Sequence, residues 1–189
     1  KEKRCKALIV TGCLAKRYKK EIIESMPLVD LCIGVDEYNK IDEILANFLN
    51  SKLINHNLEY CNRVISTDYP LAYIRISDGC DNRCSYCAIP LIRGKFRSRK
   101  MEDILEEVES LAKQGIKEFC IISQDTSKYG LDIYGKLKLP ELLNKISKIE
   151  GVKWIRVLYM YIFETSDELI TEMANNPKVC KYFDLPIQH

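Results

Sequence analysis

The chain has 189 residues, a formal net charge of +2 and a hydrophobic content of 47%. A charge this close to zero does not predict nucleic-acid binding, and the sequence has no run of 18 uncharged apolar residues that would span a membrane. We therefore expect a globular protein of the cytoplasm, with partners to be inferred from individual sites. The nine cysteines are odd in number and the opening residues do not resemble a secretory leader, so we expect no disulfide framework.

The first fifty residues predict part of an α/β domain. Apolar runs at 7–11 and 28–34 are typical of buried strands, and residues 17–26 between them have a helical pattern. Residues 51–69 then lose periodicity, gain Asn, Ser and Asp, and end in Tyr-Pro, which predicts a linker. A second helix in the first domain is predicted by four apolar residues on one face: Ile41, Ile44, Leu45 and Phe48.

Residues 70–189 predict a second domain made of β/α repeats. Strand patterns at 71–77, 118–123, 153–159 and 182–187 are separated by three helical patterns. We expect these strands to lie side by side in parallel as the first four units of a partial (β/α) barrel, with functional residues at their carboxyl ends. The fold class is therefore α/β. The first two helices are predicted by Ile104, Leu105, Val108, Leu111 and Ala112 and by Leu142, Leu143, Ile146 and Ile149; the third spans 167–175.

A loop after the strand at 71–77 holds Cys80, Cys84 and Cys87 in the pattern Cys-x3-Cys-x2-Cys. Three clustered thiolates suit a four-iron cluster and leave one iron open for a small molecule. A zinc site would need a fourth ligand, and the only histidines are His56 and His189. Cys84 and Cys87 alone could form a redox pair, but the third cysteine favours cluster ligation.

This cysteine pattern resembles the signature of the radical S-adenosylmethionine (SAM) enzymes. The resemblance extends from Val10 to His189 and indicates the methylthiotransferase family. Residues 10–18, Val-Thr-Gly-Cys-Leu-Ala-Lys-Arg-Tyr, are similar to the family's third cysteine motif, and 78–90 and 93–99 are similar to its radical-SAM loop. The resemblance implies one 4Fe-4S cluster that binds SAM on Cys80, Cys84 and Cys87, and an auxiliary 4Fe-4S cluster with Cys13 as one ligand.

Two further motifs resemble one branch of this family. Gln124-Asp125-Thr126, followed by Tyr129-Gly130, and the run Asp184-Leu185-Pro186-Ile187-Gln188-His189 are similar to the branch that methylthiolates the β-carbon of an aspartate in ribosomal protein S twelve. The tRNA-modifying branch usually has Gly-Gln-Asn and Leu-Gln-Ser there. The resemblance also implies that the remaining auxiliary ligands, the rest of the barrel and a TRAM domain lie outside this chain, so we expect this fragment alone to be inactive.

The resemblance and the strand ends also suggest residues that contact SAM or substrate. Tyr86 has the position of an aromatic residue that commonly lies beside adenine, although it could simply pack the loop. The other candidates are Gln124, Asp125, Arg156, Gln188 and His189.

Several basic residues follow the cysteine loop. The expected partners, besides the ribosomal protein substrate, are a reductant and nearby RNA. The basic residues could be a solvated surface, or could bind the SAM carboxylate, an anionic cluster, the substrate aspartate or RNA. Two alternative functions remain: the tRNA-modifying branch of the family, or a non-enzymatic protein such as an iron-sulfur electron carrier or a cluster-bearing RNA-binding protein. The basic residues are Arg93, Lys95, Arg97, Arg99 and Lys100.

Overall fold

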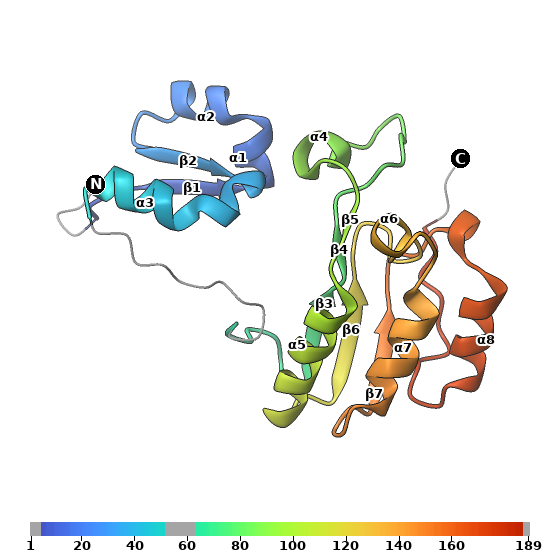
Figure 1. The fold of residues 1–189 in the computed structure, drawn as a ribbon. Coiled ribbons are helices and arrows are strands. Elements are labelled where there is room, and N and C mark those ends of the chain that lie inside the picture. The colour runs from blue at the N-terminus through green and yellow to red at the C-terminus, as the bar shows by residue number, and fades with distance from the viewer. Residues whose placement is uncertain (1–4, 52–62, 187–189) are drawn as a thin grey trace. The chain divides into compact units, whose positions relative to one another are not determined.

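The computed structural model describes residues 5–51 and 63–186. The chain divides into two compact units (Figure 1). The first consists of Lys1–Asn57 and Asp81–Gly94, and the second of Leu58–Cys80 and Lys95–His189. Most of the expected linker at 51–69 lies outside the described residues. The first unit thus includes, besides the N-terminal residues, the later segment that carries Cys84 and Cys87.

The first unit is built on a two-stranded parallel sheet. Its strands β1 and β2 pair from Ile9 opposite Leu31 to Gly12 opposite Gly34. The helix expected over 17–26 is α2, which covers residues 19–25. A further short helix, α1, precedes it and ends at Arg17, because the backbone of Tyr18 leaves the helical conformation. The elements of this unit are β1 (Ile9–Gly12), α1 (Cys13–Arg17), α2 (Lys19–Ser25), β2 (Leu31–Gly34), the 3-10 helix η1 (Val35–Lys40), α3 (Ile41–Leu49) and α4 (Ile89–Arg93).

The second unit contains the predicted parallel sheet, with three strands in the order β3-β6-β7. Alternate residues point to opposite faces of a strand. One face is apolar and fully buried, with Ile74, Ile121 and Val157 among its residues. The elements are β3 (Leu71–Arg75), β4 (Ser77–Asp78), β5 (Arg97–Ser98), α5 (Met101–Lys113), β6 (Glu118–Ile122), α6 (Leu131–Tyr134), α7 (Leu139–Lys148), β7 (Trp154–Val157), the 3-10 helix η3 (Ile162–Glu164) and α8 (Asp167–Asn175).

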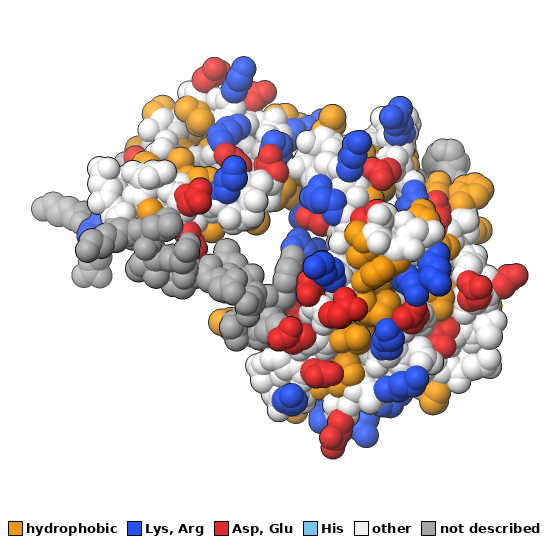
Figure 2. Space-filling view, viewed as in Figure 1, with side chains coloured by type: hydrophobic (Ala, Val, Ile, Leu, Met, Phe, Trp, Pro, Cys, Tyr) orange, Lys and Arg blue, Asp and Glu red, His pale blue; other side chains and the backbone are white. Residues whose placement is uncertain are grey.

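Helices α5 and α7 lie over one face of this sheet, and α8 packs beside α7 (Figure 1). Their apolar residues were predicted by helical spacing: Ile104, Val108, Leu142 and Ile146 are all fully buried. Acidic and basic side chains are interspersed over the outer surface of these helices (Figure 2). No helix among the described residues is long and apolar enough to cross a membrane.

The prediction of a fourth strand at 182–187 is wrong over the described part, 182–186. This segment instead follows a single parallel bridge between Ile155 and Val179. The backbone N–H of Met160 donates to the carbonyl oxygen of Asp184 at 3.0 Å, and the N–H of Tyr159 donates to Asp184 Oδ2 at 2.8 Å. The side chain of Asp184 therefore accepts a hydrogen bond from a backbone N–H, which a backbone carbonyl oxygen would accept in a regular strand ladder.

A two-stranded antiparallel stem supports both ends of the cysteine loop. Ser77 of β4 lies opposite Ser98 of β5, and Asp78 lies opposite Arg97. The segment after β6 supports this stem: the N–H of Gly130 donates to Ser98 Oγ at 2.9 Å, and the hydroxyl of Tyr129 donates to the carbonyl oxygen of Arg99 at 3.0 Å. The Tyr-Gly motif thus has a structural role in the second unit.

The carboxylate of Glu107 is buried in the apolar face of α5. Its Oε2 lies 2.6 Å from Nη1 of Arg99, and its Oε1 lies 3.1 Å from Nε of Arg63. The same Nη1 of Arg99 donates to the carbonyl oxygen of Arg75 at 2.7 Å. Arg99, one of the basic residues after the cysteine loop, therefore connects β3, the stem and α5.

Replacing Gly130 by alanine is expected to destabilise the second unit. Gly130 has φ +88°, and a Cβ there would lie 2.6 Å from Cβ of Lys138. The backbone conformation alone costs about 1–3 kcal/mol for a residue with a side chain, and the clash adds to this. Gly135 is the matched control, because it has φ +67° but nothing within 4 Å of the position that a Cβ would take. Urea unfolding should show a larger loss in the free energy of unfolding for G130A than for G135A. Equal losses would show that the contact with Lys138 does not destabilise the variant.

Candidate functional site

None of the three cysteines of the predicted cluster loop is in a disulfide. Cys80 is buried, whereas Cys84 and Cys87 are half-buried, and the N–H of Cys87 donates to the carbonyl oxygen of Cys84 at 3.0 Å. The division between the two units falls inside this loop, between Cys80 and Asp81. Among residues 5–51 and 63–186, no three His, Cys, Asp or Glu side chains are grouped as metal ligands. The cluster assignment therefore rests on the spacing and type of the thiols.

The first unit brings the other predicted ligand, Cys13, into contact with the segment that follows the loop. Cys13 begins α1, directly after Gly12 with φ +121°. Helix α4 begins two residues after Cys87 and packs against α1 and η1. At its last residue, Nη2 of Arg93 donates to Sγ of Cys13 at 3.7 Å, a distance within the range for a hydrogen bond to sulfur. Residues 80 positions apart are thus joined at the two cysteine motifs.

Two buried polar atoms lie at the carboxyl ends of neighbouring strands in the second unit. Ser77 follows β3 and is 1% exposed, and Gln124 follows β6. Ser77 Oγ and Gln124 Oε1 are buried and have no hydrogen-bond partner among the described residues. An unmet buried polar group costs about 1–3 kcal/mol, so such groups need an explanation and often mark ligand contacts. Gln124 was predicted from the sequence; Ser77 was missed, because a serine next to a strand gives no distinctive signal.

Asp125 shapes the loop after β6. It is 1% exposed, its backbone N–H donates to Ser123 Oγ at 2.9 Å, and its Oδ1 accepts from Ser127 Oγ at 2.6 Å. Ser127 Oγ in turn accepts from the N–H of Tyr161 at 3.0 Å, and this contact joins the loops after β6 and β7. Asp125 therefore holds the strand-end loops together, and its contact with a cofactor stays a prediction.

Arg156 lies within β7, on the sheet face opposite the apolar core. Its Nε donates to Oε1 of Glu118 at 3.1 Å, and this hydrogen bond raises the pKa of Arg156. The register places Arg156 beside Cys120. Burial, followed by the charge of Glu118, raises the pKa of the Cys120 thiol, so this thiol is neutral at physiological pH. Tyr73 of β3 and Trp154 of β7 are exposed on the same face of the sheet as Arg156. This face is thus more polar and more open than the core face.

The remaining predicted residues differ in their surroundings. The ring of Tyr86 is 72% exposed, so it is not buried as a packing residue of the loop. Arg97 is exposed and lies 3.9 Å from Asp78, whereas Arg93 and Arg99 make the contacts with Cys13 and Glu107. Gln188 and His189 lie outside the described residues, as does His56.

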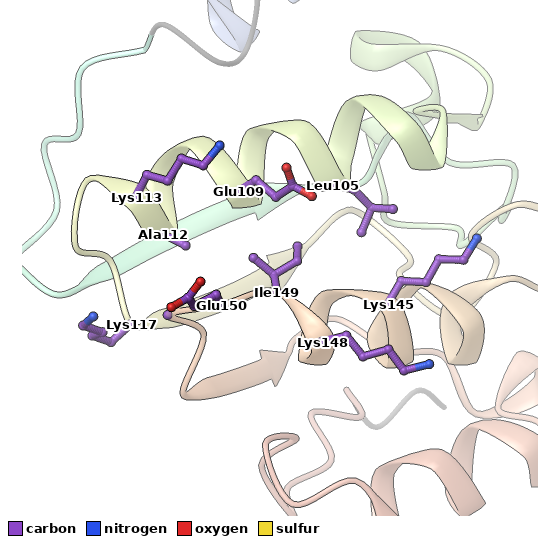
Figure 3. Close-up of a pocket in the computed structure, with 10 residues that line it drawn as sticks. Leu105, Glu109, Ala112, Lys113, Lys117, Lys145, Lys148, Ile149 and Glu150 are labelled. Atoms are coloured by element: carbon purple, nitrogen blue, oxygen red, sulfur yellow. The ribbon is translucent and has the colours of Figure 1, made fainter.

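A cavity of about 730 Å³ lies between α5 and α7 (Figure 3). It combines apolar side chains of Leu105, Ala112 and Ile149 with lysines. Lys117 and Gly151 in its lining precede β6 and β7, so it is at the opposite end of the sheet from Gln124. The hydrogen bond to Glu141 raises the pKa of Lys145 in this lining, which keeps the amine protonated and unsuitable as a base. The cavity is therefore separate from the strand ends.

The donor chemistry of these residues suits an iron-sulfur cluster and SAM. Three reduced cysteines with two short spacings can supply three ligands, since iron-sulfur clusters are held by cysteine thiolates. Ser77 Oγ can donate a hydrogen bond to a polar small molecule or accept one from it, and Gln124 Oε1 can accept one. The residues present therefore fit these groups.

Sequence comparison identifies relatives that match nearly the whole chain. Proteins named ribosomal protein uS12 methylthiotransferase RimO are 56% identical over 191 residues in Clostridium botulinum strain Hall and 53% identical over 190 residues in Alkaliphilus oremlandii. These alignments cover 97% and 100% of this chain and 43% of each relative. The chain thus spans less than half the length of these curated relatives.

A solved structure and a family model also match parts of this chain. A radical S-adenosylmethionine methyltransferase, TsrM from Kitasatospora setae, solved with cobalamin and a 4Fe-4S cluster, matches with a TM-score of 0.46 and 22% identity, over 58% of this chain and 21% of that chain. The model of the radical SAM superfamily matches residues 74–189, which include the end of β3, the cysteine loop, strands β6 and β7, and the helices that cover the larger sheet. The chain therefore belongs to the radical SAM superfamily.

Proposed function

We propose that the full-length protein is a radical SAM methylthiotransferase that modifies the β-carbon of an aspartate in ribosomal protein uS12. The observation that carries this proposal is the contact between Arg93 and Cys13. It joins the helix that follows the radical-SAM loop to the motif that the resemblance assigns to an auxiliary cluster. The uS12 methylthiotransferases that match 97–100% of the chain support the same activity and substrate.

The target carbon explains the need for radical chemistry. Its C–H bond lies beside a carboxylate that is already negative, so removal of a proton by a side-chain base would be very slow. When bound, the two clusters and SAM supply one-electron cleavage of SAM, a sulfur atom and a methyl group. Cys80, Cys84 and Cys87 would hold the first cluster and leave one iron open for SAM. Cys13 would be one ligand of the second cluster.

The other residues of the site would bind and orient. Ser77 and Gln124 would satisfy their buried polar atoms on SAM, and the exposed ring of Tyr86 would stack on adenine. Arg156 and the polar sheet face would contact the substrate. We place Gln188 and His189 in the same group from the sequence alone. A reducing electron donor, a cytoplasmic location and nearby ribosomal RNA complete the proposal.

Mass spectrometry of ribosomal protein uS12 tests the proposed substrate. Protein from cells that lack the full-length gene should have lost the methylthio group on one aspartate, and the restored gene should return it. Restoration with a C84A gene should not. If uS12 is unchanged and a tRNA instead loses its methylthio group, the tRNA-modifying activity replaces the one proposed.

A further inference from the structure

We propose that Arg93 is a positioning residue for the auxiliary cluster, where it fixes Cys13 and sets the reduction potential of that cluster. This inference rests on the proposed function, because it assumes that Cys13 is a cluster ligand. It adds a residue that lies in the radical-SAM half of the sequence and acts on the cofactor of the other half.

The first argument is the contact itself. Arg93 Nη2 donates to Cys13 Sγ at 3.7 Å, and both side chains are half-buried. A guanidinium group has five donors in a rigid plane and is always charged, so it can donate to sulfur and keep its positive charge there. Because the pair is partly removed from water, the electrostatic effect of this charge on the sulfur is larger than that of a charge on the surface.

The second argument is that the backbone holds Arg93 in place. Arg93 is the last residue of α4, and the next residue, Gly94, has φ +74° and donates its N–H to the carbonyl oxygen of Pro90 at 3.1 Å. Helix α4 packs on α1, which begins with Cys13. Helix α4, which carries the guanidinium, is therefore packed against α1, which carries Cys13.

The third argument is the contrast with the other arginines of the basic run. Arg97 has an exposed side chain near Asp78, and Arg99 is committed to Glu107, whereas Arg93 donates to a cysteine sulfur. Hydrogen bonds to cluster sulfurs and net charge are two of the factors that set iron-sulfur potentials. A cation that donates to Cys13 stabilises the more negative, reduced cluster, so it raises the potential.

The test uses the full-length protein with Cys80, Cys84 and Cys87 all replaced by alanine, so that only the auxiliary cluster remains. Iron content and an EPR-monitored redox titration are measured with Arg93 intact and as R93M, which removes both charge and donors. We expect R93M to keep the cluster with a more negative midpoint potential. R93K retains the charge and should fall between the two, and it serves as the readout if R93M does not fold.

Arg97→Met is the matched control, because it removes a cation four residues away that lies in the second unit, next to Asp78. It should leave the potential unchanged. If the cluster is present and neither R93M nor R93K changes its potential, or if R97M changes it equally, Arg93 has no specific role and the inference is overturned. If the triple-alanine protein binds no iron at all, the auxiliary cluster itself is absent. That result would contradict the proposed function and this inference together.

Discussion

Replacing Cys84 by alanine in the full-length protein is expected to abolish the release of 5′-deoxyadenosine from SAM. Cys84 is the middle of the three cysteines in the loop. A four-iron cluster with only two protein ligands there has lost the arrangement that leaves a single iron open. Release should fall to the background of protein without iron. The measurement is chromatography of the product after anaerobic reconstitution and reduction with dithionite.

Cys32 provides the matched control for this variant. It is 2% exposed, and its Sγ donates to the carbonyl oxygen of Ala15 at 3.7 Å, so it is a core residue of the first unit. C32A should retain 5′-deoxyadenosine release. If C84A released the product at the rate of the unmodified protein, Cys84 would not be a cluster ligand. An electron carrier, the alternative function, would leave SAM intact in every variant.

Replacing Glu107 by alanine is expected to lower the free energy of unfolding of the second unit by about 3–5 kcal/mol. The loss is large because Arg99 would keep a nearly buried charge, with 10% of its side chain exposed, without its carboxylate partner. Arg63 would lose its partner as well. Urea unfolding of the chain measures the change.

Glu106 is the control, since it is exposed on the same helix and is expected to change stability by no more than about 0.5 kcal/mol when replaced by alanine. E107Q should fall between E106A and E107A, because the amide still accepts a hydrogen bond but carries no charge. Similar stabilities for E107A and E106A would show that the ion pairs contribute little. Because Arg99 also contacts the backbone of β3, E107A should in addition weaken the stem below the cysteine loop.

Periodic features of the sequence predicted much of this fold. The helical spacing of Ile104, Val108, Leu142 and Ile146 found the core face of α5 and α7, and apolar runs found β3, β6 and β7. The prediction of a fourth strand was wrong over 182–186 because this segment is attached near Tyr159 and Met160 by hydrogen bonds of Asp184. An isolated sequence cannot show that a side chain replaces a backbone ladder.

The site was predicted from spacing and resemblance, whereas its supports were not. Cys80, Cys84 and Cys87 are recognisable because their spacing reflects one chemical demand. Glu107 looks like any acidic residue on an amphipathic helix, and its burial depends on Arg99 and Arg63 arriving from distant segments. The contact between Arg93 and Cys13 joins residues 80 positions apart, so only the folded chain reveals it.

An EPR experiment on the radical-SAM cluster alone tests most directly whether one iron is open. The full-length C13A protein, in which the proposed auxiliary cluster would lack a ligand, is reconstituted, reduced and measured with and without SAM. We predict the signal of a reduced 4Fe-4S cluster that changes when SAM is added, because SAM binds the iron that Cys80, Cys84 and Cys87 leave free. A signal that is the same with and without SAM, or no cluster signal at all, would contradict the account.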